Sequence, residues 1–448
     1  MAWVLILVAA GAFAGLSAMA WAGKLGFAAI GLLLLSAGLY FVGRSRLPGD
    51  ARRRPDGIAK VLFTIVGIMA LLRHPIEVEG QGSLPVYAAI TEYIDNVDAT
   101  TFILFACVAM AVKFVGVITS AYAWHLLLVG QGIRYPFWQK IMTAFLIGRF
   151  IGTFLPSTLG LDGYTLYEAG RYSNQWPRVI TAKSLEKFIG VTGLFLGMLV
   201  TLPFGYQVIV DVVTQAGRPD AAPLLAGAIA SIAGGISGVV VLGLVWPTLI
   251  EYIMHAVEWV AGRILNIGPL KKISQKVLGI LRQFREAVGA YRGKLGLLFT
   301  ALSAKFVTHF TTAAVYFFTA LAIGVTTAEF WPITFGSTIQ ILGTLFSPTI
   351  AGEGAREALQ ALLLTEQLGG VAQAVLSGAL GFIAAEAATL WGGAFLWTRT
   401  PEWRPKFALV DDKQVDYSWI SADDDGKFDA DAIARARAEH ARDVNADA

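Results

Sequence analysis

Long apolar stretches recur along this chain and constrain its fold more than any other feature of the sequence. Several contain about 18 or more apolar residues, which as a helix is enough to cross a hydrocarbon core of about 30 Å. Only 15% of the residues are charged, against roughly a quarter in soluble domains. The predicted spans cover residues 2–21, 25–42, 58–72, 101–129, 141–155, 188–206, 224–249, 295–323, 333–346 and 371–397. The sequence therefore predicts an all-α, polytopic membrane protein.

The distribution of Lys and Arg between the loops predicts the orientation in the membrane. Basic residues concentrate in 44–60 and 251–294, so both loops and the N-terminus are predicted to be cytoplasmic. The first apolar stretch has no Lys or Arg before Lys24 and is followed at once by another, which favours an uncleaved helical hairpin over a signal peptide. We expect a bacterial inner-membrane protein with a cytoplasmic C-terminus. Apolar residues at helical spacing within 251–294 predict an amphipathic helix, either at the lipid interface or as a linker.

The sequence repeats itself weakly at an offset of 192 residues. Between positions 113 and 156, ten of 44 residues are identical to those 192 positions later. The matched pairs include Lys113 with Lys305, Thr119 with Thr311, Gly132 with Gly324, and Pro156 with Pro348. Such a match also arises by chance among apolar helices, so the residues that follow each matched proline decide the interpretation.

A helix-breaking segment follows each matched proline, and both segments contain a hydroxyl residue, a glycine and then an acid–glycine pair. The predicted hinge residues are Pro156, Gly160, Gly163, Pro348, Gly352 and Gly354. Broken helices at membrane depth occur where the segment is buried in protein or lines a cavity. Two of them at corresponding places in two halves point to a transporter's binding site. Counting basic residues predicts two re-entrant hairpins in an inverted repeat, with repeats near 101–187 and 295–368.

These features divide the chain into three regions. Residues 1–100 are predicted to be an accessory segment with about three membrane helices. Residues 101–400 are predicted to form the main transmembrane domain, which contains the repeat. Residues 401–448 are rich in Asp, Ala and Arg and are predicted to form a disordered cytoplasmic tail.

Charged residues within or next to the apolar stretches are the candidates for function, since each costs about 2.5 to 3.5 kcal/mol near the bilayer centre. The predicted transport path consists of Arg149, Asp162, Glu186, Lys187, Glu353, Arg356 and Glu357. An Arg binds phosphate through two hydrogen bonds, and a half-helix N-terminus adds N–H donors, so an anionic lipid headgroup fits this path. Alternatively, the carboxylates accept protons, or they form purely structural pairs with Arg149 and Arg356.

Four further expectations concern single residues. Glu186 is expected in the first turn of a helix that opens at Ser184, where an ordinary interfacial charge stabilised by the helix dipole is the alternative to a site residue. Lys113 and Lys305 either extend to the interface or share a role. Trp124 is predicted to be an interfacial anchor.

Four motifs in this order resemble the flippase-like membrane domain of lysylphosphatidylglycerol synthases and their stand-alone relatives. They are Trp124 with Leu126-Leu127-Leu128, Phe154 to Gly163, Glu186 to Gly190, and Ser347-Pro348 through Glu357. The resemblance covers about 300 residues, from Thr101 to Thr400, and implies that the chain moves lipids between leaflets. By position it implies that the site residues are Asp162, Glu186, Glu353, Arg356 and Glu357.

The chain also departs from this family. The family commonly has Gly where this chain has Leu161, and Arg where it has Lys187, which bears on the substrate more than on the fold. The stretch after Trp403 is too short for the aminoacyltransferase domain of the synthases, so lipid synthesis is not expected.

The leading hypothesis is a transporter that moves an anionic amphiphile, a phospholipid or a polyprenyl-linked lipid, between bilayer leaflets. The alternatives are a proton- or ion-coupled carrier of a small solute and a membrane-embedded lipid-headgroup transferase. The sequence contains no nucleotide-binding loop, zinc-ligand spacing or nucleophile elbow. We therefore expect no enzymatic activity, cofactor, metal or nucleic-acid partner. The oligomeric state and the energy source stay open.

Overall fold

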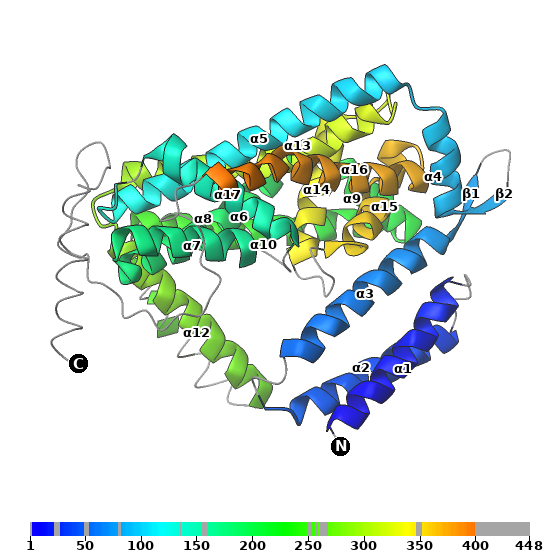
Figure 1. Ribbon diagram of the computed structural model, residues 1–448, viewed down its shortest axis with the longest axis horizontal. Helices are drawn as coiled ribbons and strands as arrows, with labels where there is room; N and C mark the ends of the chain where they lie inside the picture. Colours follow the sequence, from blue (N-terminus) through cyan, green and yellow to red (C-terminus); the bar gives the residue numbers. More distant parts are fainter. Residues whose placement is uncertain are drawn as a thin grey trace. The chain divides into compact units, whose positions relative to one another are not determined.

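In the computed structural model, nearly all of the described chain is helical (Figure 1). The structure describes residues 2–398 except 22–26, 49–52, 79–81, 135, 155–158, 346–351, and all of 247–267 but 248–249, 252–253, 255–256 and 259. The predicted tail, Pro156 and Pro348 thus lie outside the described residues.

Three apolar helices open the chain, close to the predicted positions. They are α1 (Ala2–Trp21), α2 (Phe27–Ser45) and α3 (Arg53–Arg73). Gly43 allows α1 and α2 to approach closely, because a Cβ there would lie 2.9 Å from Cγ1 of Ile6. Phe13, Leu16 and Val66 form a small apolar core between α1 and α3.

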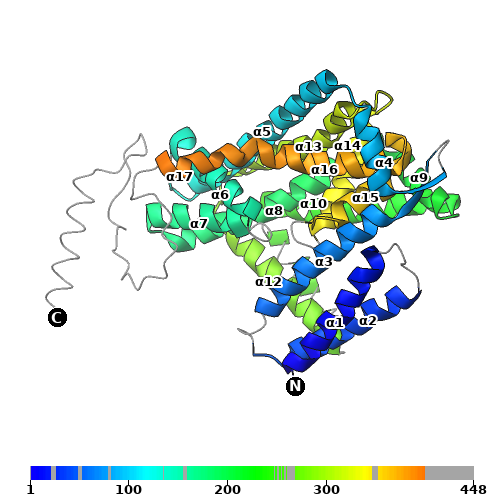
Figure 2. The ribbon, with the colours of Figure 1, turned by 45° about the vertical axis from the view of Figure 1, so that its right-hand side comes forward.

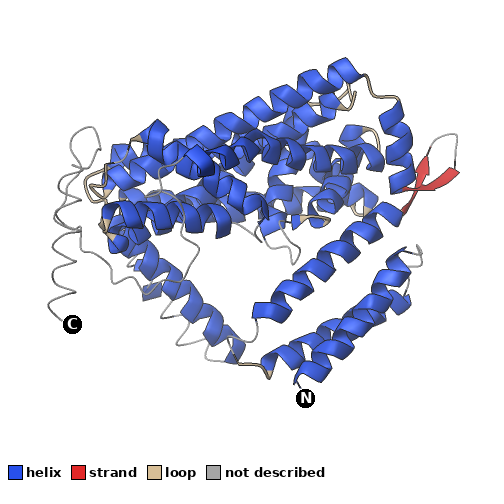
Figure 3. Ribbon diagram, in the orientation of Figure 1, coloured by secondary structure: helices blue, strands red, loops and turns tan. Residues whose placement is uncertain are grey.

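A two-stranded antiparallel sheet follows α3 within a described chain that is otherwise helical, in agreement with the predicted all-α class (Figure 3). Its strands are β1 (Pro75–Val78) and β2 (Gly82–Pro85), with Ile76 opposite Leu84 and Val78 opposite Gly82. Its four-residue strands are too short to give a recognisable alternation of apolar and polar residues in a sequence dominated by apolar helices.

The remaining helices contain two similar series, each with a long helix, two short helices and another long helix. The first series is preceded by α4 (Val86–Asp95) and comprises α5 (Ala99–Gly130), the π-helical η2 (Phe137–Met142) with α6 (Thr143–Phe154), α7 (Leu159–Ser173) and α8 (Trp176–Thr201). The connecting elements are α9 (Tyr206–Gln215), the 3₁₀ turn η3 (Pro219–Ala221), α10 (Ala222–Val245) and α12 (Gly268–Gly289). The second series comprises α13 (Leu295–Ala322), α14 (Phe330–Leu345), α15 (Ala355–Leu368) and α16 (Val371–Leu390), followed by η5 (Trp391–Ala394) and α17 (Phe395–Thr398).

The first long helix of each series ends in the same way. Gly132 and Gly324, 192 positions apart, have φ of 81° and 85°, a conformation that favours glycine. The N–H of Gly132 donates to the carbonyl of Val129 at 2.9 Å, and that of Gly324 to the carbonyl of Leu321 at 3.0 Å. Both are C-terminal caps that satisfy carbonyls left over at a helix end.

Four helical stretches of the described chain are long and apolar enough to cross a membrane. They are Ala99–Gly130, Trp176–Thr201, Pro219–Val245 and Val371–Ala394. By contrast, α6, α7, α14 and α15 have only 12 to 16 residues, or about 18 to 24 Å at 1.5 Å per residue. Each is shorter than a hydrocarbon core of about 30 Å.

The chain groups into two compact units. Unit 1 comprises the described residues of Met1–Ala111, Thr201–Ala226 and Ala313–Ala385, and unit 2 those of Val112–Val200, Gly227–Thr312 and Glu386–Ala448. Unit 2 therefore contains the hairpin of α6 and α7, and unit 1 that of α14 and α15.

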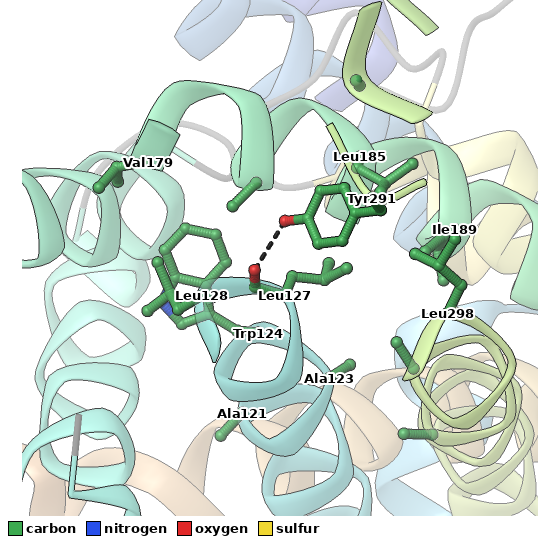
Figure 4. Close-up of a cluster of buried hydrophobic side chains, with 14 of the residues drawn as sticks. Ala121, Ala123, Trp124, Leu127, Leu128, Val179, Leu185, Ile189, Tyr291 and Leu298 are labelled. Atoms are coloured by element: carbon green, nitrogen blue, oxygen red, sulfur yellow. Dashed lines mark hydrogen bonds between the residues drawn. The ribbon is translucent and has the colours of Figure 1, made fainter. Parts of the chain in front are cut away.

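Unit 2 has a large apolar core around the C-terminal half of α5 (Figure 4). Trp124, Leu127 and Leu128 are almost fully buried there. The hydroxyl of Tyr291 donates to the carbonyl of Leu127 at 2.6 Å and so caps the end of α5. Trp124 is only 2% exposed, so its prediction as an interfacial anchor is wrong: its neighbours in the fold cover it.

The amphipathic helix predicted in the second basic loop is present as α12. Its apolar residues Leu278, Phe284 and Val288 belong to the core of unit 2, and Phe284 packs on Phe188 of α8 with ring centroids 4.8 Å apart. Leu278, Phe284 and Val288 are thus buried against protein, whereas Ile280 on the same helix is 45% exposed.

Candidate functional site

Close packing of two short helices positions the first candidate residue. Helices α6 and α7 lie side by side (Figure 1), and a Cβ added at Gly160 would lie 2.4 Å from backbone atoms of Gly152. No larger residue fits there without moving a helix. Asp162 lies two residues further on, in the first turn of α7, where a carboxylate is favoured by the helix dipole.

Three further charged residues of the site lie on one face of α8. This helix begins at Trp176, with Pro177 in its first turn, a position that tolerates proline because its missing N–H has no partner in a helix. Glu186 and Lys187 come three and four residues after Lys183, which places the three side chains side by side. Glu186 therefore lies in the interior of the helix, and its expected place in a first turn is wrong.

A group of five charged side chains from α7, α8 and α13 meets in unit 2. We call it the lysine–carboxylate cluster, and it consists of Asp162, Lys183, Glu186, Lys187 and Lys305. Glu186 is its centre, because its two carboxylate oxygens lie 2.7 Å from Nζ of Lys183 and 2.6 Å from Nζ of Lys305. Asp162 is 3.1 Å from Nζ of Lys183 and also pairs with Lys187.

Neutral and aromatic side chains complete the partners of the lysines. Lys183 donates to the hydroxyl of Thr165 at 3.1 Å, and Lys305 to the hydroxyl of Ser120 at 2.9 Å. The ammonium of Lys183 also lies 4.7 Å from the ring centroid of Trp124, a favourable cation–π distance. Buried charges are tolerated when their hydrogen-bonding capacity is met in this way.

Exposure within the cluster is graded. The side chains of Lys183, Glu186 and Lys305 are 9%, 6% and 8% exposed, that of Asp162 is 23% exposed, and that of Lys187 is 54% exposed. The five residues carry three ammonium groups and two carboxylates, one more positive than negative charge. The cluster thus extends from a buried ion pair to an open edge that favours an anion.

Arg149 has a different partner from those that the sequence suggested. Its Nη2 lies 3.2 Å from Oε1 of Glu386, and its Nε donates to the hydroxyl of Thr389 at 3.2 Å. The hydroxyl of Thr153 donates to the other oxygen of Glu386 at 2.5 Å. Arg149 and Glu386 are 20% and 19% exposed. Arg149 is thus ion-paired, but with Glu386 and not with a carboxylate of the predicted path.

The candidates of the second hairpin lie in unit 1, at the start of α15. Gly352 and Gly354 have φ of 76° and 77°, so they form a turn that other residues adopt only with strain. Glu357 accepts the N–H of Gly354 at 2.7 Å and caps the helix. Arg356 lies 3.5 Å from Glu357, with its guanidinium 4.0 Å from the ring centroid of Phe382. Glu353 lies in the turn, partly buried.

The hinge residues thus fall into two kinds. Gly352 and Gly354 provide a turn of positive φ, whereas Gly160 provides space for close helix packing. Gly163 meets nothing within 4 Å at its Cβ position, so no steric need for glycine is visible there.

Lys113 and Lys305 take part in a reciprocal contact between α5 and α13. Lys113 donates to the hydroxyl of Thr312 at 3.1 Å, and Lys305 to that of Ser120 at 2.9 Å. A shift of 192 residues turns Lys113 into Lys305 and Ser120 into Thr312, so the two contacts are equivalent. Both lysines are buried, which favours a shared role over extension to the interface.

A second reciprocal pair lies in the same seam. The hydroxyls of Thr119 and Thr308 are 2.9 Å apart, and a Cβ at Gly116 would lie 2.4 Å from the hydroxyl oxygen of Thr311. Shifted by 192, Gly116 becomes Thr308 and Thr119 becomes Thr311. In this stretch the two matched helices are therefore antiparallel and face each other through corresponding residues.

Sequence reasoning missed several members of these groups. Lys183, Thr165 and Ser120 were not proposed as site residues, and neither was Glu386. Only Lys183 gave a usable signal, because it lies three residues before Glu186 on the same helix face. No cluster of three or more His, Cys, Asp or Glu side chains suited to a metal occurs among the residues described.

The sequence model of one family, the lysylphosphatidylglycerol synthase TM region, matches residues 86–392, well over half of the chain. The chain belongs to this family. That match confirms the resemblance seen in the motifs and shows an integral membrane protein of a family whose name associates it with lipids. No match was found among curated proteins or among solved structures.

Proposed function

We propose that this protein moves an anionic amphiphile between the leaflets of the membrane, and that the headgroup passes along the lysine–carboxylate cluster. The observation that supports this most is the graded exposure of the cluster together with its excess of one positive charge. A phosphate arriving at Lys187 finds an ammonium whose present partner, Asp162, is itself partly exposed. The phosphate oxygens can replace that carboxylate without leaving a charge unpaired.

The reciprocal contacts between α5 and α13 support a second part of the proposal. We propose that the two series of helices are an inverted repeat and that their short hairpins, α6–α7 and α14–α15, are re-entrant. Antiparallel equivalent helices are expected for inverted repeats, and transporters of that kind bind their substrates near the bilayer midplane, between the repeats. The short lengths of these helices agree with segments that enter and leave on one side.

Leaflet exchange in liposomes tests the proposal. The purified protein would be reconstituted with fluorescent phosphatidylglycerol or fluorescent polyprenyl phosphate, and the fraction accessible to an external quencher would be followed over time. Asp162→Asn removes the carboxylate that has to pair with Lys187 again when the phosphate leaves, so it is expected to slow exchange by about tenfold or more. A tenfold change in rate corresponds to about 1.4 kcal/mol. Asp220→Asn, the same change at an exposed residue, is expected to have no effect.

Two results would contradict the proposal. One is that neither lipid exchanges while the protein is folded, with or without a proton gradient. The other is that Asp162→Asn exchanges lipid as fast as Asp220→Asn. Exchange that occurs only with a proton gradient would favour the ion-coupled alternative.

A further inference from the structure

The interior of unit 1 contains polar side chains that are buried without hydrogen-bond partners. Within the described part of the chain, these unpartnered atoms include the hydroxyls of Thr334 and Ser337, Oε1 of Gln340, and both amide atoms of Gln360. All four residues are 0% exposed. Buried polar groups nearly always have a partner, so a group of exceptions in one place requires an explanation.

These side chains come from neighbouring elements of one hairpin. Thr334, Ser337 and Gln340 follow at spacings of three on α14 and so lie along one side of that helix. Helices α14 and α15 lie side by side (Figure 2). They pack closely, because a Cβ at Gly336 would lie 2.5 Å from Leu364. Gln360 lies one turn before Leu364 on α15, near the middle of the hairpin.

Two glycines of α16 lie next to this group. A Cβ at Gly378 would lie 3.3 Å from the Gln360 side chain, and one at Gly381 would lie 2.4 Å from the ring of Tyr316. These glycines are three residues apart and share one face of α16. The amide of Gln340 in turn donates to the hydroxyl of Tyr316 at 3.4 Å. We call Tyr316, Thr334, Ser337, Gln340 and Gln360 the amide–hydroxyl cluster.

The charges near this cluster cancel. Arg356 lies one turn before Gln360 on α15 and is 3.5 Å from Glu357, so one positive and one negative charge are paired. Its guanidinium lies over the ring of Phe382. The cluster therefore presents hydrogen-bonding groups with no net charge, unlike the lysine–carboxylate cluster of unit 2.

The unpartnered atoms define the chemistry of a ligand. The amide nitrogen of Gln360 is a donor, the amide oxygens of Gln340 and Gln360 are acceptors, and the two hydroxyls do both. A carboxylate only accepts and an ammonium only donates, so neither meets the whole set. A hydroxyl group both donates and accepts. We infer that the α14–α15 hairpin binds a neutral hydroxyl-bearing group, such as a sugar or polyol headgroup, through the amide–hydroxyl cluster.

This inference does not depend on the phosphate path of unit 2, and its test uses a lipid without phosphate. The protein would be placed in phosphatidylcholine nanodiscs with equal amounts of glucosyl-diacylglycerol and diacylglycerol, and retained lipid would be identified by native mass spectrometry. The wild-type protein is expected to retain the glucosyl lipid preferentially. Gln340→Leu with Gln360→Leu is expected to lower this preference by about tenfold, as the loss of two ligand hydrogen bonds would.

Thermal unfolding distinguishes a binding role from a structural one. Both amide atoms of Gln360 lack a hydrogen-bond partner among the described residues, and replacing such an amide by an apolar group of similar size is nearly neutral or stabilising. The amide of Gln340, by contrast, also donates to Tyr316. The single variant Gln360→Leu should therefore unfold at the same or a higher temperature while lowering the preference for the glucosyl lipid. Gln207→Leu, the same change at an exposed residue of α9, should leave both properties unchanged. Should the double variant be poorly expressed, Ser337→Ala provides a smaller change with the same expected direction.

Three outcomes would overturn the inference. In the first, the wild-type protein shows no preference for the glucosyl lipid, which would mean that the cluster holds only ordered water. In the second, the Leu variants keep the full preference. In the third, Gln360→Leu unfolds at a clearly lower temperature, which would show that this amide has structural partners. Asp162→Asn is expected to keep the preference, so a failure of the phosphate path would be seen separately. Competition by methyl glucoside would show that the hydroxyl-bearing group is bound without lipid chains.

Discussion

The two short hairpins of this protein, α6–α7 in unit 2 and α14–α15 in unit 1, have the same place in their series of helices but different polar interiors. Next to α7 lies a network of ionised groups in which Glu186 bridges Lys183 and Lys305. Within α14–α15 lie uncharged amides and hydroxyls, several of them without partners in the described chain, including those of Gln360. Similar helix lengths thus support two kinds of chemistry.

The glycines of the hairpins show the same divergence. In α6–α7, Gly160 packs against the backbone of Gly152, so it sets the distance between two helices. In the other hairpin, Gly352 and Gly354 adopt positive φ in the turn before α15. Gly160 and Gly352, which are 192 positions apart, therefore have different structural reasons in the two hairpins.

The largest expected difference between the hairpins concerns removal of a carboxylate. Glu186→Gln leaves two buried ammonium groups without their shared counter-ion, and we expect the free energy of unfolding to fall by about 3 to 5 kcal/mol. Chemical denaturation in mixed micelles measures this. Glu353→Gln, in the turn of the other hairpin, is the matched control, with an expected loss of less than about 1 kcal/mol. An equal loss of unfolding free energy in the two variants would contradict the contrast between an ionised and a neutral interior.

A smaller difference is expected from added methyl groups. Gly160→Ala would place its Cβ 2.4 Å from the backbone of Gly152, and such overpacking costs about 1 to 3 kcal/mol. Gly343→Ala, within α14, would place its Cβ 2.5 Å from Cδ1 of Leu359, which is the end of a side chain that can rotate. This variant should therefore lose less of the free energy of unfolding. Gly163→Ala meets nothing and should be neutral or stabilising by up to about 1 kcal/mol. The same denaturation measurement ranks the three, and a reversed order would show that α6 and α7 can separate easily.

Double-mutant cycles compare the arginine pairs. Arg149 and Glu386 come from different segments and have matched hydrogen bonds, so Arg149→Met with Glu386→Gln should give a coupling of about 1 kcal/mol. Arg356 and Glu357 are neighbours 3.5 Å apart, and each has another contact. Their coupling should be below about 0.5 kcal/mol. A stronger coupling for Arg356 would indicate that unit 1 also depends on an ion pair.

The smallest effect concerns the starts of the matched long helices. Asp98 precedes α5 and accepts the N–H of Thr101 at 2.7 Å, and this backbone hydrogen bond lowers the pKa of Asp98 below its ordinary value of 3.8. Because the pKa is lowered on folding, the cap stabilises the protein above pH 3.8, and that contribution is lost as the pH falls through the lowered pKa. The residue before α13 is Lys294, which has no carboxylate, so the start of α13 lacks this cap. Below pH 3.8 the unfolding temperature of the native protein should approach that of Asp98→Ala, and a constant difference would contradict the cap.

Much of the fold could be predicted because hydropathy is a local property. The apolar stretch predicted at 101–129 became α5, and the one at 371–397 became α16 with its short continuation, each within a few residues. The bilayer sets the length of such segments, so composition alone identifies them. The family, too, could be inferred from motifs in sequence order. The start of α8 was misplaced by several residues because its first two turns carry basic and polar residues, and hydropathy alone does not mark them as helix.

The partners of the charged residues were decided only by tertiary structure. Glu186 and Lys305 are 119 positions apart, and Arg149 and Glu386 are 237 apart. Such pairs depend on how helices pack and which face each turns toward its neighbour, and neither hydropathy nor motif spacing contains that information. By itself, the sequence determined a predominantly helical integral membrane protein with charges inside its helices. The packing of those helices decided that Lys183 and Lys305 share one carboxylate in unit 2, while the matching hairpin of unit 1 encloses neutral amides.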